Sequence, residues 1–344
     1  MNYIGSKFSL VDFIKDSVTD TLHRVNEQRN PDEMIFADLF SGTCAVGGAF
    51  KSQGYSVIAN DIQYYSYIVS KHVLENDGNL DEERCVELIS QLNNIDGVQG
   101  FIYKNYALGG TQNTEFPRMY FSDYNAMKCD AIRQTIELWK NENQITENEY
   151  IFLIASLVNS IDKYANTASV YGAYLKNLKK SAQKEMVLTA FPIVHGADNC
   201  IAYNRDISEL IKEVSGDILY LDPPYNARQY CTNYHLLETI ARYDNPVIYG
   251  KTGLREYKEQ KSVFCNRSKV AEAFDELIKA ANFKYIFLSY NNEGLMSFDT
   301  IEKIMKKYGK YRYYLQTYRR FKADSARESK ADSTVEYLHC LIKE

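Results

Sequence analysis

A short apolar run at residues 218–221 is stopped by two consecutive prolines in the tetrapeptide Asp222-Pro223-Pro224-Tyr225. The run has the length and composition of a buried parallel strand, and the prolines force the chain out of it as a rigid turn. Since proline has no N–H donor, the carboxylate of Asp222 and the carbonyl of Pro223 remain as acceptors with little freedom. The sequence therefore predicts a rigid pair of hydrogen-bond acceptors at the carboxyl end of a strand.

This acceptor pair suits an aromatic amine, such as the exocyclic amine of adenine, whose nitrogen lone pair is delocalised into the ring. Accepting both amine hydrogens draws the nitrogen toward tetrahedral geometry and makes its lone pair available for attack on an electrophilic methyl group. Tyr225 offers a π face for stacking the base, a contact worth roughly 1–3 kcal/mol in single-stranded recognition. Taken alone, the tetrapeptide is also compatible with an ordinary Asp-Pro turn after a strand.

A methyl donor then needs a site, and a strand, glycine turn and helix at residues 34–48 offer one. The loop has neither the GK[ST] of a phosphate-binding loop nor GxGxxG, so it supports neither ATP nor a dinucleotide. Asp61 follows the next apolar run, 23 residues after Asp38. This is close to the spacing at which a second-strand carboxylate holds ribose hydroxyls. Glycine turns of this kind also occur in many α/β proteins of other functions.

Four segments follow one another along the chain: Tyr3 to Lys7, Asp38 to Gly47, the pair Asn60-Asp61 and the 222–225 tetrapeptide. Their order resembles that of the α-group of N6-adenine DNA methyltransferases, including those of type II restriction-modification systems. The resemblance covers both ends of the chain and leaves the middle open. It implies S-adenosylmethionine as the cofactor. It also assigns Asp206, in a short acidic motif before the catalytic strand, to the cofactor's adenine. The expected catalytic residues are Asp222, Pro223, Pro224 and Tyr225, and the expected cofactor residues are Tyr3, Lys7, Asp38, Phe40, Gly42, Asp61, Asp206 and Asp222.

The carboxyl-terminal part continues this resemblance. The polar end of an apolar run at 283–292 is similar to the family's Ser-Asn element beside the target base. Arg319 and Arg320 precede a polar stretch and a strand-like segment, as in the family's final hairpin, whose arginines approach DNA phosphates. Residues 303–322 contain eight Lys or Arg and no acid, interleaved with aromatic residues, which suits a nucleic acid. A solvated helix face followed by an amphipathic strand is the alternative.

The alternation of strand-like and helical segments predicts an α/β fold with a doubly wound sheet. We expect a Rossmann-like S-adenosylmethionine-dependent methyltransferase fold with a seven-stranded mixed sheet, whose last two strands form an antiparallel hairpin. The catalytic domain is predicted to comprise residues 1–65 and 200–344. The expected strands are 34–40, 55–60, 200–204, 218–222, 284–289, 311–318 and 335–342.

Between these two parts the alternation stops, and residues 66–199 are predicted to form a mainly helical target-recognition insertion, with helices at 126–141 and 150–165. The segment after the second helix combines hydrogen-bonding, aromatic and basic side chains, and Asn and Lys can pair with base edges. The predicted DNA-binding residues are Asn166, Tyr171, Tyr174, Lys176, Lys179, Lys180, Arg319 and Arg320, with Asn113, Arg118, Tyr120, Asn125 and Arg133 as further candidates.

Composition limits the remaining possibilities. The chain has 344 residues and a net charge of −5, which excludes a generally basic protein but leaves room for local positive charge at double-stranded DNA. The seven cysteines show no metal-ligand spacing, so we expect reduced thiols and no metal. With no signal peptide or apolar stretch of membrane-spanning length, a cytoplasmic protein without a membrane partner is expected.

The sequence therefore predicts a site-specific enzyme that methylates N6 of a flipped adenine in duplex DNA, with a possible cognate restriction endonuclease as functional partner. An RNA adenine methyltransferase could use the same amine chemistry. A protein-glutamine methyltransferase would more typically carry Asn at position 222. A noncatalytic DNA-binding subunit could lack Lys7, Asp61 or Asp222, and all three are present.

Overall fold

The computed structural model describes residues 6–319 and 333–344, which form two compact units. The first, here called the helical unit, contains residues 63–193 and 230–260. The second, the sheet unit, contains residues 6–62, 194–229 and 261 onward. Residues 230–260 thus pack with the helical unit, although they follow the 222–225 tetrapeptide in sequence and were expected in the catalytic domain.

The sheet unit contains a seven-stranded mixed sheet in the order β3-β2-β1-β4-β5-β7-β6. The first five strands in that order run parallel, whereas β7 is antiparallel to both β5 and β6. The predicted seven strands and the terminal antiparallel hairpin are therefore confirmed. The strands are β1 (Ile35–Asp38), β2 (Ser56–Asn60), β3 (Ile201–Tyr203), β4 (Ser215–Leu221), β5 (Asn282–Asn291), β6 (Gly309–Arg319) and β7 (Ser333–Lys343).

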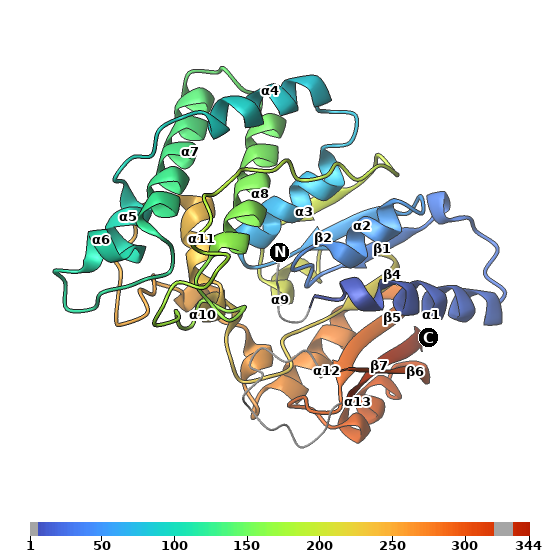
Figure 1. Cartoon of the computed structure of the whole chain (residues 1–344). Helices are drawn as coiled ribbons and strands as arrows, with labels where there is room; N and C mark the ends of the chain where they lie inside the picture. Colours follow the sequence, from blue (N-terminus) through green and yellow to red (C-terminus); the bar gives the residue numbers. More distant parts are fainter. Residues whose placement is uncertain (1–5, 320–332) are drawn as a thin grey trace. The chain divides into compact units, whose positions relative to one another are not determined.

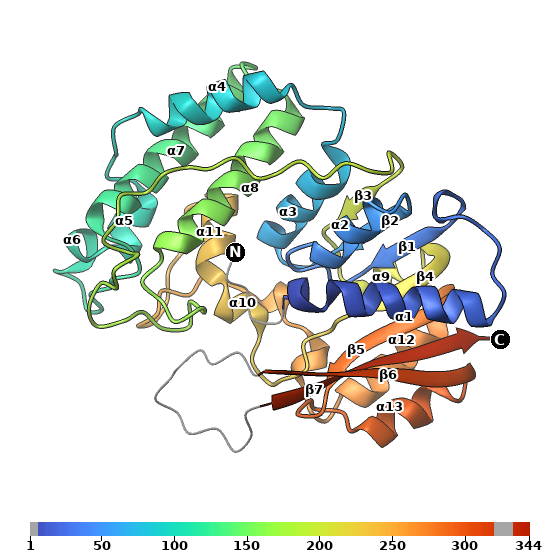
Figure 2. The same cartoon turned by 45° about the vertical axis from the view of Figure 1, so that its right-hand side comes forward.

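Helices cover both faces of this sheet, because alternate residues of each buried strand point to opposite sides. On one face Phe36 of β1 stacks on Phe50 of α2 with ring centroids 3.7 Å apart, and Thr21 of α1 lies 2.8 Å from the Tyr314 hydroxyl of β6. On the other face Leu219 and its neighbours pack against α12 and α13. Figure 2 shows α1 in front of the sheet and α12 and α13 behind it. The helices of this unit are η1 (Phe8–Leu10), α1 (Val11–Arg24), η2 (Pro31–Glu33), α2 (Ala45–Lys51), α9 (Ile207–Leu210), η4 (Val263–Cys265), α12 (Val270–Ala280) and α13 (Phe298–Met305).

The strand order reverses between β1 and β4. From β1 the chain moves outward to β2 and β3, and it then returns to place β4 on the other side of β1. In open sheets of this kind, the carboxyl ends of the two strands at the reversal leave a crevice that binds ligands. The acids Asp38 and Asp222, at the ends of β1 and β4, therefore lie where the topology favours a ligand site.

The helical unit is built around α8, most of whose residues are buried. Figure 1 shows α7 and α3 running beside it. A capping box fixes its start, with Thr146 and Glu149 each accepting a hydrogen bond from the other's backbone N–H. The expected helices at 126–141 and 150–165 correspond to α7 and α8. No helix in the described part of the chain is long and apolar enough to cross a membrane. The helices of this unit are α3 (Tyr64–Glu75), α4 (Glu82–Asn93), α5 (Phe101–Tyr106), α6 (Leu108–Thr111), α7 (Asp123–Asn141), α8 (Glu147–Tyr164), α10 (Tyr230–Asn233), α11 (His235–Arg242) and η3 (Lys258–Gln260).

Candidate active site

The tetrapeptide at residues 222–225, predicted to be catalytic, directly follows β4, whose last four residues are buried between the helix layers. Asp38 pairs with Tyr220 in the register of β1 and β4, so Asp38 and Asp222 share one edge of the sheet. Burial, opposed by the Lys7 ammonium and reinforced by the charge of Glu336, raises the pKa of Asp222 to about 6. The carboxyl group of Asp222 is therefore an acceptor that stays ionised near neutral pH.

Lys7 lies beside the tetrapeptide, whereas the family resemblance assigned it only a contact with S-adenosylmethionine. Its ammonium is 3.0 Å from Oδ1 of Asp222 and 2.9 Å from Oε1 of Glu336 on β7. Burial opposes the charge of Lys7, but the two carboxylates outweigh it and raise the pKa of this lysine well above its usual value. Lys7 thus remains a fixed cation inside the site.

Tyr225 is half-buried and is held by the chain around it. The backbone N–H of Leu295 donates to the Tyr225 carbonyl at 3.0 Å. Its ring meets the Tyr290 ring edge-on, with centroids 5.9 Å apart, and the Lys7 ammonium lies 5.3 Å from its centroid. These contacts fix the orientation of an aromatic face next to Asp222.

Asp38 is the second buried acid of the site, with a side chain that is 2% exposed. Its Oδ2 accepts a hydrogen bond from the backbone N–H of Gly47 at 3.2 Å, whereas its Oδ1 has no hydrogen-bond partner among the described residues. Burial, with the charges of Asp222 and Asp61, raises the pKa of Asp38 to about 8. An unsatisfied buried oxygen of this kind is costly for the protein alone and suits a ligand that brings a donor or a positive charge.

The glycine turn after β1 is attached to the end of β2. The backbone N–H of Gly42 donates to Oδ2 of Asp61 at 2.9 Å, and Gly42 has a φ of +51°, which a residue without Cβ adopts most easily. The side chain of Asn204, after β3, donates to the Asp61 carbonyl at 2.7 Å. The ends of β1, β2 and β3 therefore converge on Asp61.

Phe40 and Asp206 lie at the periphery of this group. Phe40 is half-buried and meets the ring of Phe264 edge-on at 5.2 Å. Asp206 is exposed and caps α9 by accepting hydrogen bonds from the backbone N–H and the hydroxyl of Ser208. The described contacts of Asp206 are thus those of a helix cap, and they do not join it to Asp38 or Asp222.

Sequence reasoning missed Glu336, although it is among the most buried acids of the chain. Its Oε1 also accepts a hydrogen bond from the hydroxyl of Ser289, at 2.8 Å. The one available signal was an acid inside an otherwise apolar strand. Because strand residues alternate between faces, that pattern is equally typical of a solvent-facing position.

Some predicted DNA-binding residues do not present their side chains to solvent. The amide of Asn166 is fully buried, donates to the carbonyls of Met119 and Leu175, and accepts from the Lys179 N–H. Tyr171 is also fully buried, and its hydroxyl donates to Asp162. Both residues hold the segment after α8 in place, so neither is available to DNA in this structure.

The other predicted residues of this segment differ in exposure. Lys176 and Lys180 are exposed, while Tyr174 is half-buried and donates to the Pro117 carbonyl at 2.7 Å. The ammonium of Lys179 donates to the Thr167 carbonyl at 2.9 Å. Tyr3 and Arg320 lie outside the described residues, and Arg319 is described only as the backbone end of β6.

The further candidates are mostly structural. The guanidinium of Arg133 donates to the carbonyls of Ile240 and Ala241 at the end of α11, which it caps. The buried side chains of Arg118, Tyr120 and Asn125 likewise bond to backbone carbonyls. Long-range backbone contacts of this kind leave no trace in the local sequence pattern.

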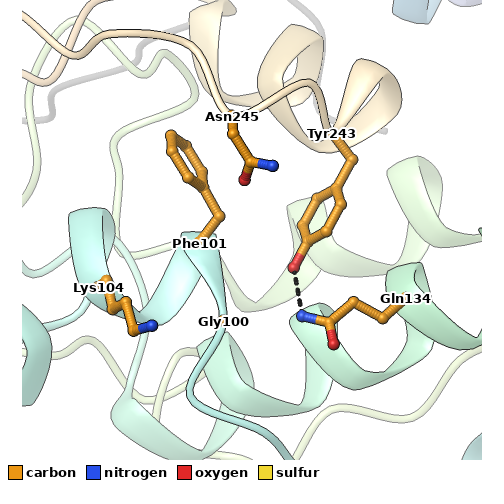
Figure 3. Close-up of a pocket in the computed structure, with 6 residues that line it drawn as sticks. All are labelled: Gly100, Phe101, Lys104, Gln134, Tyr243 and Asn245. Atoms are coloured by element: carbon orange, nitrogen blue, oxygen red, sulfur yellow. Dashed lines mark hydrogen bonds between the residues drawn. The ribbon is translucent and has the colours of Figure 1, made fainter.

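The helical unit also has a pocket of about 390 Å³ (Figure 3). The Gln134 amide donates to the hydroxyl of Tyr243, and that hydroxyl donates in turn to the buried carboxylate of Asp130. This pocket contains none of the predicted catalytic or cofactor residues. Its lining is formed by Gly100, Phe101, Lys104, Gln134, Tyr243 and Asn245.

An open sheet of this order, with acids at its reversal point and a carboxyl-terminal antiparallel hairpin, defines a Rossmann-like methyltransferase. The chain belongs to the family of D12 class N6 adenine-specific DNA methyltransferases, whose sequence model matches residues 3–323. The family predicted from the sequence is therefore confirmed, and the protein is an adenine-specific DNA methyltransferase.

Named relatives agree with this assignment. The type II methyltransferase M.NlaIII of Neisseria lactamica is 48% identical over all of this chain and 99% of its own length. The type II methyltransferase M.CviAII of Paramecium bursaria Chlorella virus 1 is 36% identical over 94% of this chain and 93% of its own. M.FokI of Planomicrobium okeanokoites is 40% identical over the whole chain, which covers 53% of that larger protein. No solved structure gave a significant match.

Within the described residues no group of three or more His, Cys, Asp or Glu side chains could hold a metal ion. All seven cysteines lie in the described part of the chain, and none of them is in a disulfide.

Proposed function

We propose that this enzyme uses S-adenosylmethionine to methylate N6 of an adenine rotated out of duplex DNA, and that it is the modification enzyme of a type II restriction-modification system. The observation that carries the proposal is the placement of Asp222, Asp38 and Lys7 together at the sheet's reversal point. The restriction-modification assignment is supported by relatives that are named type II methyltransferases over nearly their whole length.

The acids of the site fit this cofactor. S-adenosylmethionine carries a cationic sulfonium and an ammonium group, and Asp38 offers a buried oxygen without a hydrogen-bond partner in the described chain. Asp61, beside the glycine turn, is positioned for ribose hydroxyls. When bound, the cofactor would supply an electrophilic methyl group. Lys7, Phe40, Gly42 and Asp206 complete the proposed cofactor site, together with Tyr3, which lies outside the described residues.

The chain's own groups would position the amine. Asp222 and the carbonyl of Pro223 accept its two hydrogens, Pro224 keeps the turn rigid, and Tyr225 stacks on the base. The amine nitrogen would form a bond to the methyl carbon as the carbon–sulfur bond of the sulfonium breaks; the neutral thioether would leave, and the methylated amine would release one proton to solvent. Catalysis comes mainly from positioning and from acceptors placed where positive charge develops on nitrogen. Flipping the base costs a few kcal/mol, which DNA contacts must offset.

We place target recognition in residues 66–199, together with the packed residues 230–260. Lys176 and Lys180 are exposed and suit phosphates, and Tyr174 and Lys179 lie in the same segment. The pocket around Lys104 carries amide and ammonium groups of the kind that pair with base edges. Arg319 and Arg320 are proposed to approach the DNA backbone from the terminal hairpin.

Isothermal titration calorimetry with S-adenosylmethionine tests the cofactor assignment directly. We expect the wild-type enzyme to bind it and the Asp61→Ala variant to bind at least about tenfold more weakly, equivalent to ~1.4 kcal/mol. Asp12→Asn is the matched control, because this acid is 89% exposed on α1 and should leave binding unchanged. Absence of binding by a folded wild-type protein, at concentrations far above micromolar, would refute the cofactor assignment.

The restriction-modification role has a separate test. Plasmid DNA from a host expressing the enzyme should resist a type II endonuclease that cleaves the methylated sequence, once long-read sequencing has defined that sequence. Faster methylation of RNA than of duplex DNA carrying the same sequence would instead favour an RNA substrate.

A further inference from the structure

Glu336 has no assigned part in methyl transfer, yet it touches the catalytic group through one intermediary. Its Oε1 lies 2.9 Å from the Lys7 ammonium, which in turn lies 3.0 Å from Oδ1 of Asp222. The side chains of Lys7 and Glu336 are 5% and 1% exposed, so water screens the two charges only weakly. The three groups form a carboxylate, ammonium and carboxylate chain inside the sheet unit.

Glu336 is itself held firmly. It lies on β7 opposite Asn291 of β5, and the Ser289 hydroxyl, two residues along the same face of β5, donates to its Oε1 at 2.8 Å. Such diagonal pairs across neighbouring strands are within reach of one another. Both strands are paired with a neighbour on each side, and the Glu336 side chain is 1% exposed, so this carboxylate is a rigid anchor rather than a surface charge.

The position of Glu336 limits the competition between the Lys7 ammonium and the substrate amine for the oxygens of Asp222. A lysine with Asp222 as its only carboxylate partner would centre its ammonium on that acid and compete with the substrate amine for its oxygens. A second carboxylate on the other side of the ammonium divides the attraction. Lys7 then contacts Oδ1 of Asp222 while being drawn away from the oxygen that the amine requires.

We propose that Glu336 is a positioning residue for methyl transfer, which acts by holding Lys7 so that the Asp222 carboxylate is oriented but remains available to the adenine amine. This inference rests on the proposed role of Asp222. Glu336 touches neither of the reacting atoms, so its effect must pass through Lys7.

Electrostatics supports the same arrangement. The two carboxylates and the one ammonium leave a net negative charge, which favours the positive charge that develops on the amine during transfer. Burial raises the pKa of Asp222 and the Lys7 ammonium lowers it. The charge of Glu336 raises this pKa as well, by a smaller effect. The charged and titratable groups around Asp222 are Lys7 from the amino-terminal segment, Asp38 from β1, Tyr220 from β4, Tyr225 from the turn and Glu336 from β7.

The primary test is Glu336→Gln, which keeps the shape and the acceptor for Ser289 but removes the charge. We expect single-turnover methylation to fall by about tenfold to a hundredfold, the loss expected when a group that positions a reactant is disturbed. Melting temperature and KM for DNA should stay close to wild type. The acid limb of the pH profile should move to lower pH, because Asp222 loses a neighbouring negative charge.

Glu344→Gln is the matched control, since it removes an acid from the exposed end of the same hairpin, where it pairs with Lys310. It should change neither rate nor pH profile. If Glu336→Gln fails to fold, Ser289→Ala provides the second variant, because it loosens Glu336 without changing any charge and should lower the rate by a smaller factor at unchanged KM.

A double-mutant cycle separates a positioning role from a merely structural one. If Glu336 acts through Lys7, then Glu336→Gln should cost little or nothing further in a Lys7→Met background. The inference is wrong if folded Glu336→Gln turns over at the wild-type rate with an unshifted pH profile, or if its effect is fully retained without Lys7. Failure of the wild-type enzyme to methylate adenine would instead refute the proposed function.

Discussion

At the scale of single residues, the buried carboxyl group of Asp38 lowers the folding stability of the protein as the pH rises. A free aspartate titrates near pH 4, whereas burial, followed by the charges of Asp222 and Asp61, raises the pKa of Asp38 to about 8. Between these pH values the folded protein holds a proton that the unfolded chain has lost. Folding stability is therefore lost as the pH rises from about 4 to 8, and more so without a cationic ligand.

This leads to a prediction for Asp38→Asn without cofactor. The neutral amide cannot be ionised in the buried site, so the variant should gain stability relative to wild type as the pH rises from 5 to 9, by up to about 4 kcal/mol, since about three pH units separate pH 5 from the folded pKa of about 8 and each corresponds to about 1.4 kcal/mol. Thermal or urea unfolding at both pH values measures the difference. Parallel profiles of stability against pH for the two proteins would show that ionisation of Asp38 does not destabilise the folded protein. The variant should also bind the cofactor poorly.

Asp222 gives a second prediction at this scale. Since its pKa is about 6, a falling pH should protonate it and remove an acceptor for the amine. The kcat/KM for cofactor, which reports groups of the free enzyme, should decline below pH 6 by up to about tenfold per pH unit. Steady-state methylation between pH 5 and 8.5 provides the profile. A flat profile across that range would argue against an ionised Asp222.

At the scale of elements, the period of the apolar residues was enough to predict all seven strands and the two longest helices. Short apolar runs ended by Asp, Gly or Pro identify β1, β2 and β4, because a buried parallel strand needs an apolar core and a polar exit. The carboxyl end of each strand then placed Asp38, Asp61 and Asp222 at one edge.

The pattern of apolar residues could not predict contacts between distant segments of the chain. Residues 230–260 join the helical unit through the packing of α11 against α3 and α8, which no local signal encodes. Asn166 has the composition of a base-reading residue, yet its amide is consumed by three hydrogen bonds that hold a loop. The proximity of Lys7 to Asp222, 215 positions apart, was not predicted, because the family resemblance assigned Lys7 only a contact with the cofactor.

The exposed lysines after α8 yield a prediction for this element. If the segment contacts phosphates, a Lys176→Ala and Lys180→Ala double variant should raise KM for DNA and reduce the salt dependence of binding by about two counterions, with kcat little changed. Binding isotherms at several salt concentrations measure the slope. A Lys212→Ala and Lys279→Ala pair, two exposed charges of the sheet unit, is the control. An unaltered slope would place the DNA backbone elsewhere.

At the scale of the whole molecule, the chemistry and the proposed recognition reside in different parts of the chain. The sheet unit contains every described residue proposed to touch cofactor or amine, and the helical unit provides the exposed lysines and the pocket around Lys104. The family match covers both units, since its sequence model spans residues 3–323, although the motifs recognised in the sequence lie toward the two ends. Because the two sets of residues lie in different units, variants of the helical unit should alter DNA affinity and sequence preference without abolishing cofactor binding.

The central claim is that the Asp222 turn presents the N6 amine of adenine for methyl transfer. The most direct measurement is mass spectrometry of nucleosides from DNA of a methylation-free host that expresses either the wild-type enzyme or Asp222→Ala. We expect N6-methyladenine with the wild type and none above background with the folded variant. A different methylated base, or a comparable amount of N6-methyladenine with Asp222→Ala, would contradict it.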